Sequence, residues 1–232
     1  MENDDLENLA KEFVKKNEDF IIAKFAGESS YIPDSTPISL FMAGSPGAGK
    51  TEVSRSLVKK FNSMPILIDA DELRKICPGY IGTNAHIFQK AAVKGINILL
   101  DHALDNKLNF ILDGTFAYAD PIANIQRSID RSRVVEVWFI YQKPELAWKF
   151  TQIREAVESR RVVKEKFIEA TIKSRDNAIS AKKHFGKAIE LNLLTKNLDN
   201  TDGDIRLNIS TKELDRYLGT GYTKDELNNL LE

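Results

Sequence analysis

One short stretch of this chain carries the residue types that bind the phosphates of a nucleotide. Its glycines let the backbone adopt positive φ angles and bring successive N–H groups close to an anion. Its lysine can bridge β- and γ-phosphate oxygens, and the hydroxyl that follows can complete the coordination of Mg²⁺. The stretch matches the pattern GxxxxGK[ST] and reads Gly44-Ser45-Pro46-Gly47-Ala48-Gly49-Lys50-Thr51. It therefore predicts a phosphate loop that binds a nucleoside triphosphate with Mg²⁺.

The residues on either side supply the context that a phosphate loop requires. An apolar run at 38–43 precedes it, and a helical pattern at 51–61 follows. A buried strand, a glycine-rich turn and a helix N-terminus in this order direct backbone N–H groups at a bound phosphate. Both flanks favour this interpretation over the alternative, a glycine turn followed by a solvated lysine.

Two later apolar runs end in carboxylates. Asp69-Ala70-Asp71 follows the run at 66–68, and Asp113 follows the run at 108–112. Ligands of open parallel sheets bind beyond the carboxyl ends of the strands, which makes these acids candidates. Asp113 is expected to orient Mg²⁺ and its waters or to contact the substrate; the alternative is a carboxylate that accepts N–H bonds at a turn. Asp71 is expected to accept the proton of an acceptor hydroxyl, with a helix cap as the alternative.

A charged helical stretch that begins at Pro144 contains a third set of candidates. In a continuous helix, Arg154 and Arg161 would lie about 20° apart in direction, whereas Arg160 would lie roughly 120° away. Two guanidinium groups on one face could clamp a triphosphate and stabilise the charge of the transition state. The alternative is a solvated helix face with local pairing to the glutamates at 155, 158 and 165.

Other polar residues carry weaker signals. The helix expected at 121–131 contains Asn124, Arg127 and Arg131, one of which is expected to reach an acceptor molecule. The histidines at 86, 102 and 184 are scattered along the chain. Their spacing argues against a zinc cluster and against a Ser–His–Asp hydrolase.

Composition limits the class of protein. The chain has 232 residues, enough for one large domain with a buried core. Its 33 basic and 34 acidic residues nearly cancel, so no overall field favours nucleic acid or a membrane as a partner. Cys77 is the only cysteine, which excludes an internal disulfide. The acidic first residues and the short apolar runs predict a cytoplasmic protein.

The candidates must be positioned by alternating strands and helices. Apolar runs predict strands at 38–43, 66–68, 108–112 and 134–141, and helical periodicity predicts helices at 51–61, 86–106, 121–131 and, with interruptions, 144–184. This order predicts βαβ crossovers and a mostly parallel sheet with helices on both faces. The fold class is therefore expected to be α/β, a three-layer phosphate-loop kinase fold at residues 36–200.

Both ends of the chain are expected to add to this domain. Residues 1–35 form an N-terminal helical segment, with helices at 4–16 and 18–26. The apolar stripe of the first helix either packs onto the domain or docks a separate partner. Residues 201–232 form a C-terminal strand and helical appendage.

Two patterns describe the C-terminal region in more detail. Apolar stretches at 189–194 and 205–209 predict a β-hairpin with Asp202-Gly203 near its turn. Two capping boxes, Ser210 with Glu213 and Thr223 with Glu226, predict a short helical hairpin.

Taken together, these motifs resemble the zeta-toxin family of bacterial kinases. The similarity runs from about residue 36 to 185 and keeps the family's order and spacing. It is carried by the phosphate loop, by ILIDADELRK at 66–75 with Pro78-Gly79-Tyr80, by NFILDGTF at 109–116 with Asp120-Pro121-Ile122, and by Arg154 with Arg160-Arg161-Val162-Val163. Three positions depart from the family pattern: Asn97 for an acid, Ala117 for an arginine and Lys164 for a proline.

The resemblance implies a function. It implies ATP-dependent phosphorylation of the 3′-hydroxyl of the amino sugar in UDP-N-acetylglucosamine or a related UDP-amino sugar, with Mg²⁺. It places Lys50 and Thr51 at the phosphates and the metal, makes Asp71 the base for the sugar hydroxyl, and makes Arg154 and Arg161 the phosphate clamps. It also places three residues in the substrate site: Asp113, where the family usually has Glu, Thr115, and Asn124, where Thr is common.

The resemblance also implies a partner and leaves alternatives. Zeta toxins are often neutralised by a small helical antitoxin that blocks the nucleotide site. The alternative is that the acidic N-terminal helices of this chain shield the site themselves. The same phosphate machinery would serve a kinase of another small molecule, such as a nucleoside, an antibiotic or a sugar. A third possibility is a nucleotide-dependent switch or binding module without phosphate transfer.

Overall fold

A single mixed sheet forms the centre of the molecule. The computed structural model describes residues 3–27, 29–158 and 162–231. Within these residues the strands are β1 (Ile38–Ala43), β2 (Ile66–Asp69), β3 (Phe110–Asp113), β4 (Val134–Tyr141), β5 (Glu190–Lys196) and β6 (Asp202–Arg206). Their order across the sheet is β2-β3-β1-β4-β5-β6. The first five strands run parallel and β6 runs antiparallel to β5, which confirms the mostly parallel sheet.

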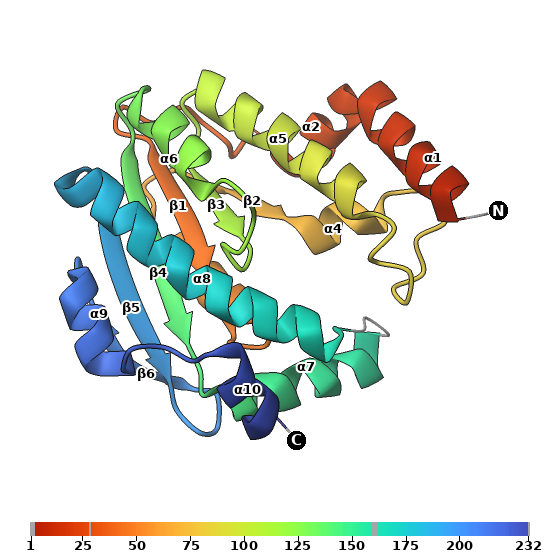
Figure 1. Ribbon diagram of the computed structural model, residues 1–232. Helices are drawn as coiled ribbons and strands as arrows, with labels where there is room; N and C mark the ends of the chain where they lie inside the picture. The colour runs from red at the N-terminus through yellow and green to blue at the C-terminus, as the bar shows by residue number, and fades with distance from the viewer. Residues whose placement is uncertain (1–2, 28, 159–161, 232) are drawn as a thin grey trace.

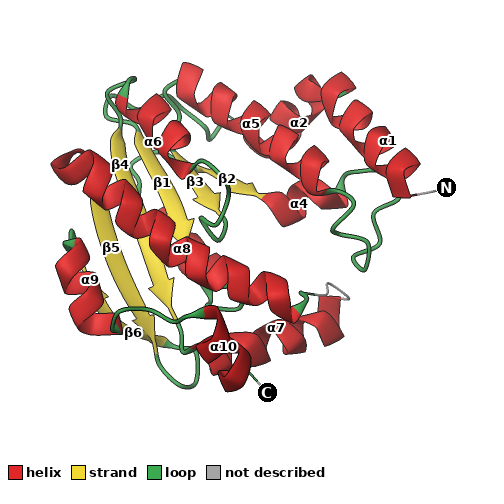
Figure 2. Ribbon diagram, in the orientation of Figure 1, coloured by secondary structure: helices red, strands yellow, loops and turns green. Residues whose placement is uncertain are grey.

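Helices cover both faces of this sheet (Figure 1). They are α1 (Asn3–Lys16), α2 (Glu18–Ala26), α3 (Lys50–Leu57), α4 (Ala70–Lys75), α5 (Gln89–Asp105), α6 (Pro121–Ile129), α7 (Pro144–Glu158), α8 (Lys164–Phe185), α9 (Thr211–Leu218) and α10 (Lys224–Leu230). Figure 2 shows α5, α6 and α8 over one face. The predicted α/β fold in three layers is therefore confirmed. Within the described residues, none of these helices is both long and apolar enough to cross a membrane.

The core is divided between the two faces. Side chains of alternating direction along β1 place Phe41 and Ala43 in the larger cluster, together with α5 and α8. Leu40 and Met42 point to the other face, where they pack with Val53 of α3. All of these side chains are buried. Because helices cover both faces of the sheet, its strands are continuous apolar runs in the sequence.

The order of the strands decides where a ligand can bind. The chain returns from β2 and β3 to one side of β1 and then passes to β4 on its other side. A crevice forms beyond the carboxyl ends of the strands where the direction of the crossovers reverses. The phosphate loop follows β1 at this point, with the β2 and β3 carboxylates on one side and α7 on the other.

The N-terminal helices pack onto the domain. Ala10, Val14 and Ile21 are at most 1% exposed and belong to the larger core cluster. Glu7 of α1 accepts a hydrogen bond of 2.9 Å from Lys90 of α5. The apolar stripe of α1 therefore packs onto the domain, which was the first of the two expectations for it.

The C-terminal region differs from the prediction in one respect. The predicted hairpin of β5 and β6 is present, with its turn at 197–201 and Asp202-Gly203 directly after the turn, at the start of β6. Both capping boxes are present. The predicted helical hairpin is wrong, because Leu214 of α9 is buried in the main core and Leu227 of α10 is buried in a separate cluster with α7 and α8. The two helices therefore lie apart, each packed against a different cluster (Figure 1).

Candidate active site

The phosphate loop has the backbone conformation that a glycine-rich anion site requires. Gly44, Gly47 and Gly49 have φ values of 135°, 74° and 83°. A Cβ atom at Gly44 would lie 2.3 Å from the Ile140 carbonyl oxygen, and one at Gly47 would lie 2.1 Å from the Ala147 oxygen. Only glycine fits at these two positions. Gly49 caps the N-terminus of α3, whose first N–H groups face the loop.

Lys50 is held inside the loop. Its side chain is buried, and Nζ donates to the backbone oxygens of Gly44 at 3.1 Å and Ser45 at 2.7 Å. An ammonium group on the concave side of the loop can bind phosphate oxygens without a large change of rotamer. The geometry therefore suits the role that the motif predicts.

Asp113 lies against the start of α3. It is 9% exposed, and Oδ2 accepts a hydrogen bond from Ser54 Oγ at 3.2 Å. Burial raises the pKa of Asp113, against the effects of Lys50 and of hydrogen bonds from Thr51 and Ser54. The carboxylate at the end of β3 and the Ser54 hydroxyl of α3 thus meet, although they are distant in sequence.

These oxygen atoms suit a magnesium ion that is also held by phosphates and water. Mg²⁺ usually keeps several waters and takes one or two protein oxygen ligands beside a nucleotide. The Thr51 hydroxyl and the Asp113 carboxylate provide this donor set. Among the described residues there is no group of three or more His, Cys, Asp or Glu side chains that could hold a metal ion by itself.

Asp69, not Asp71, caps helix α4. Asp69 Oδ1 accepts the backbone N–H of Asp71 at 2.8 Å. The alternative reading of Asp71 as the cap is therefore wrong, because the extended end of β2 places the cap two residues earlier. Burial and the adjacent Asp71 carboxylate raise the pKa of Asp69 to about 6, and Asp113, its register partner on β3, adds to this effect.

Asp71 is oriented by an arginine of the same helix. Arg74 Nη1 donates to Asp71 Oδ1 at 2.5 Å, and Arg74 Nη2 donates to Gln89 Oε1 of α5. The Arg74 side chain is 7% exposed and that of Asp71 is 19% exposed. Asp71 is thus fixed in direction and still accessible from solvent, at the edge of the sheet that carries Asp113.

The loop after β3 holds the remaining substrate-site candidates. The Thr115 backbone oxygen accepts from Gly44 N at 3.4 Å, so this loop touches the phosphate loop. Asn177 of α8 donates to the backbone oxygens of Phe116 and Tyr118 at 2.7 and 3.1 Å. Asn124 lies on α6, where its Oδ1 accepts from Arg127 at 3.3 Å.

Arg127 of α6 and Arg131, in the turn that follows α6, face α5. Arg127 forms an ion pair with Asp101, and Arg131 forms one with Asp105 at 3.0 Å. Both guanidinium groups therefore have carboxylate partners on the neighbouring helix, and the expectation that one of Asn124, Arg127 and Arg131 reaches an acceptor molecule stays a prediction.

The two predicted clamp residues have different outcomes. Arg154 is exposed on α7. Arg161 and Arg160 lie outside the described residues. The argument that Arg154 and Arg161 share a face needs one continuous helix, and α7 ends at Glu158 while α8 begins at Lys164.

Helix α8 contributes residues that the sequence analysis missed. Ser174 is fully buried, and its Oγ accepts from Gly44 N at 2.6 Å. With Asn177, it supports both loops of the site from behind. A lone serine in a charged helical stretch carries no motif, so no local signal could have identified it.

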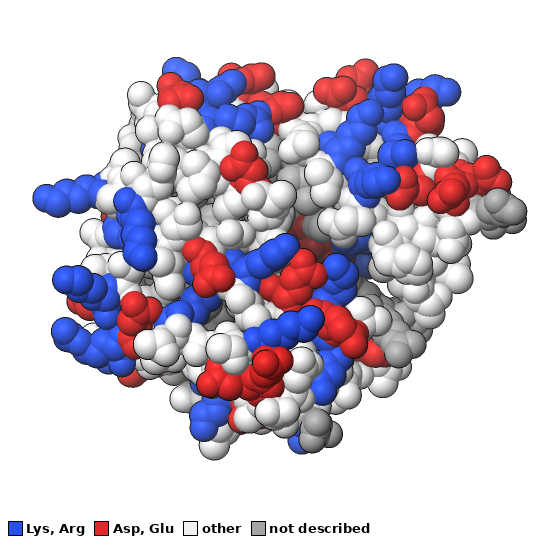
Figure 3. Space-filling model, in the orientation of Figure 1, with Lys and Arg blue, Asp and Glu red and all other residues white. Residues whose placement is uncertain are grey.

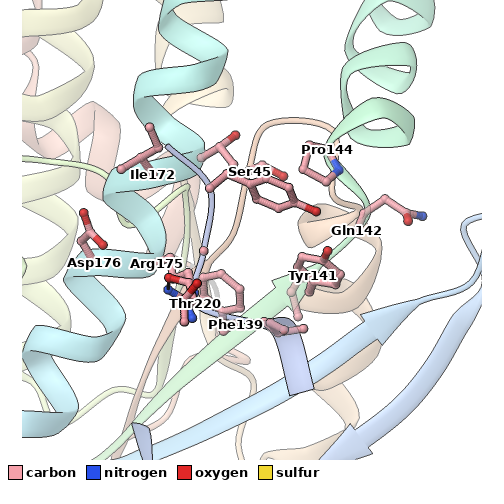
Figure 4. A pocket seen from close by; sticks show the side chains of 14 residues that line it. Ser45, Phe139, Tyr141, Gln142, Pro144, Ile172, Arg175, Asp176 and Thr220 are labelled. Carbon is pink, nitrogen blue, oxygen red and sulfur yellow. Dashed lines mark hydrogen bonds between the residues drawn. The ribbon is translucent and has the colours of Figure 1, made fainter. Parts of the chain in front are cut away.

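A small cavity lies beside the phosphate loop. Its volume is about 70 Å³, and it is enclosed by the end of β4, by α8 and by the chain between α9 and α10. Figure 4 shows Ser45, Tyr141, Ile172 and Thr220 around it. On the outer surface, acidic and basic side chains are interspersed, with no large area of one sign in the view of Figure 3.

Comparisons with known proteins identify a family for this chain. The family described as Zeta toxin matches residues 23–201. Toxin PezT of Streptococcus pneumoniae serotype 4 is 29% identical over 126 residues, which are 51% of this chain and 50% of PezT. The chain therefore aligns with about half the length of this curated relative.

Two solved structures share the fold. One, from the characterisation of the PezAT chromosomal toxin-antitoxin system of Streptococcus pneumoniae, has a TM-score of 0.71 at 18% identity and covers 94% of this chain and 91% of its own. The other, AvrRxo1-ORF1:-ORF2 with ATP, has a TM-score of 0.60 at 12% identity and covers 91% and 71%. The family match extends over most of the chain, from α2 to the end of the β5–β6 turn. This chain belongs to the zeta toxin family.

Proposed function

We propose that this protein is a kinase that transfers the γ-phosphate of ATP to a hydroxyl of a UDP-amino sugar such as UDP-N-acetylglucosamine. The observation that carries the proposal is the hydrogen bond from Ser54, in the helix that follows the phosphate loop, to Asp113 of β3, whose register partner Asp69 lies two residues before Asp71. A triphosphate site and an accessible carboxylate then lie at one edge of the sheet. This is the arrangement that phosphate transfer to an alcohol needs.

Each residue has one task in this proposal. The N–H groups of the loop and Lys50 bind the phosphates, and Thr51 and Asp113 hold Mg²⁺, which would neutralise charge on the phosphates. Asp71 accepts the proton of the attacking hydroxyl as the new oxygen–phosphorus bond forms and ADP leaves. Arg154 and Arg161 stabilise the charge on the transferred group.

Arg74 restrains Asp71 in this scheme. Its hydrogen bond of 2.5 Å orients the Asp71 carboxylate, and Gln89 holds the guanidinium group from α5.

The family and the relatives support the proposed acceptor and the proposed partner. Membership of the zeta toxin family supports a UDP-amino sugar as acceptor. The structures with the same fold come from a toxin-antitoxin system and from the AvrRxo1-ORF1:-ORF2 complex, which supports an antitoxin partner for this chain. Two of the three departures from the family pattern are Asn97, which is exposed on α5, and Ala117, which lies two residues after Thr115 in the loop after β3. A different small-molecule acceptor is the second candidate.

One experiment tests the proposal and separates it from its rivals. The full chain is incubated with ATP, Mg²⁺ and either UDP-N-acetylglucosamine, a mixture of nucleosides and free sugars, or a metabolite extract, and the products are identified by mass spectrometry. A phosphorylated UDP-amino sugar is the expected product. A phosphorylated nucleoside or free sugar would replace the acceptor, and binding of ATP with no phosphorylated product in any mixture would favour a nucleotide-dependent switch.

A further inference from the structure

The C-terminal residues wrap around the helices beside the phosphate loop. We call residues 215–231 the C-terminal clasp: the end of α9, the link that follows and α10. They lie outside residues 23–201, which match the family. Figure 1 shows the chain crossing from α9, beside the sheet, to α10, which lies over α7 and the adjoining part of α8.

Arg175 of α8 holds the link. Its guanidinium group donates to the backbone oxygens of Gly219 and Thr220, at 2.6 Å for Thr220, and pairs with Asp215 at 2.6 Å. Gly221 has a φ of 94°, and a Cβ atom there would lie 2.6 Å from Arg175 Nη1. The link is therefore fitted closely to this one side chain.

Helix α10 joins α7 to the first turns of α8. Leu227 is fully buried, and it packs with Ala147 of α7 and with Phe167 of α8 in a cluster that is separate from the main core. Lys164, the first residue of α8, donates from Nζ to the backbone oxygen of Asn228 at 3.0 Å. One short helix thus contacts both members of the helix pair.

The same two helices touch the phosphate loop on their inner side. The Ala147 oxygen and the Thr151 methyl group of α7 lie 2.1 and 3.0 Å from the Cβ position of Gly47. Ser174 of α8, next to Arg175, accepts the hydrogen bond of Gly44 N. A shift of α7 or α8 would therefore move groups that press on the loop, and it would move Arg154 with α7.

We propose that the C-terminal clasp positions the pair α7 and α8 over the phosphate loop, with Lys164 and Arg175 as its positioning residues. The proposal rests on the proposed kinase function, in which Arg154 stabilises the transferred phosphate. Neither Lys164 nor Arg175 needs to touch ATP. Each acts through the helix that it holds, and small displacements of a charge-stabilising group cost large factors in rate.

The first test compares two lysines of the same helix. Lys164→Met keeps the aliphatic stem and removes the hydrogen bond to α10, whereas Lys166→Met removes an exposed lysine that pairs with Glu169. We expect Lys164→Met to lower kcat for phosphate transfer from ATP to UDP-N-acetylglucosamine about tenfold, with the Kd for ATP changed less than about twofold. Lys166→Met keeps the wild-type kcat, and Lys164→Arg restores most of it.

The second test does not depend on activity. Hydrogen–deuterium exchange is measured for α7 and for the start of α8 in the full chain. We expect faster exchange there in Lys164→Met and in Arg175→Met than in two control variants, Lys166→Met and Lys173→Met. Lys173 is exposed and pairs with Glu169.

The two measurements distinguish failure of the clasp proposal from failure of the proposed kinase function. If the wild-type protein transfers no phosphate, the proposed function fails, and the exchange data still decide whether the clasp holds the helix pair. If Lys164→Met and Arg175→Met lower the melting temperature but leave kcat unchanged, the clasp is structural and the positioning proposal is wrong. Unchanged exchange and unchanged kcat in both variants would overturn it entirely.

Discussion

Ser174 in the middle of α8 accepts a hydrogen bond of 2.6 Å from the backbone nitrogen of Gly44, the first glycine of the phosphate loop. The Gly44 N–H group also points toward the Thr115 oxygen at 3.4 Å, a much weaker contact. A helix that is 130 positions later in the chain thus decides how the loop leaves β1.

Replacement of Ser174 tests this support. Ser174→Ala leaves a buried N–H group with only the longer contact, which costs about 1–2 kcal/mol in the free energy of unfolding. We also expect weaker ATP binding, because the loop is less well ordered. Denaturant unfolding and calorimetric titration with ATP measure the two effects. Ser180→Ala, at an exposed position of the same helix, should change neither quantity.

Lys50 is expected to be essential for ATP turnover. Lys50→Ala removes the ammonium group that lies inside the phosphate loop, and ATP consumption should fall at least about a hundredfold. The protein should remain folded, which circular dichroism checks. Lys59→Ala, at an exposed position after α3, is the control and should consume ATP like the wild type. Wild-type turnover by Lys50→Ala would contradict the assignment of the loop.

Asp71 is expected to be needed for transfer but not for nucleotide binding. Asp71→Asn keeps the shape of the side chain and removes the proton acceptor, so kcat should fall by a factor of about 10²–10⁴ while the Kd for ATP stays within about threefold. The control is Glu72→Gln, which alters the next residue; Glu72 is half exposed and paired with Lys75. Transfer at the wild-type rate by Asp71→Asn would rule out Asp71 as the base.

The raised pKa of Asp69 predicts a pH-dependent stability. Because the pKa rises from 3.8 to about 6 on folding, the folded state binds more protons than the unfolded state between these values, and this group lowers stability as the pH rises through that window. Asp69→Asn keeps a capping oxygen and removes the charge. Without Mg²⁺, the variant should therefore gain stability relative to the wild type between about pH 4 and 6, by up to about 2–3 kcal/mol, and the difference should be constant above pH 7.

Denaturant unfolding of both proteins at several pH values measures this difference. A difference that does not change with pH would mean that Asp69 is ionised throughout this range.

The amino-acid sequence by itself determined the fold and the centre of the site. Strands and helices alternate because apolar runs and helical periodicity are local properties, and right-handed crossovers then leave few ways to order the sheet. The phosphate loop could be recognised from its glycines. Its tight turn brings other backbone atoms so close to them that no side chain fits there. The acids at the ends of β2 and β3 were found by the same reasoning, since parallel strands end at one edge.

Only the tertiary structure decided which distant groups support that centre. Ser174, Asn177 and Arg175 carry no motif, and their roles depend on how α8 crosses the sheet. The same is true of α9 and α10, whose capping boxes predicted two helices but not their separate partners. Local patterns specify backbone conformation within a few residues, whereas these contacts join positions that are brought together only when the core packs.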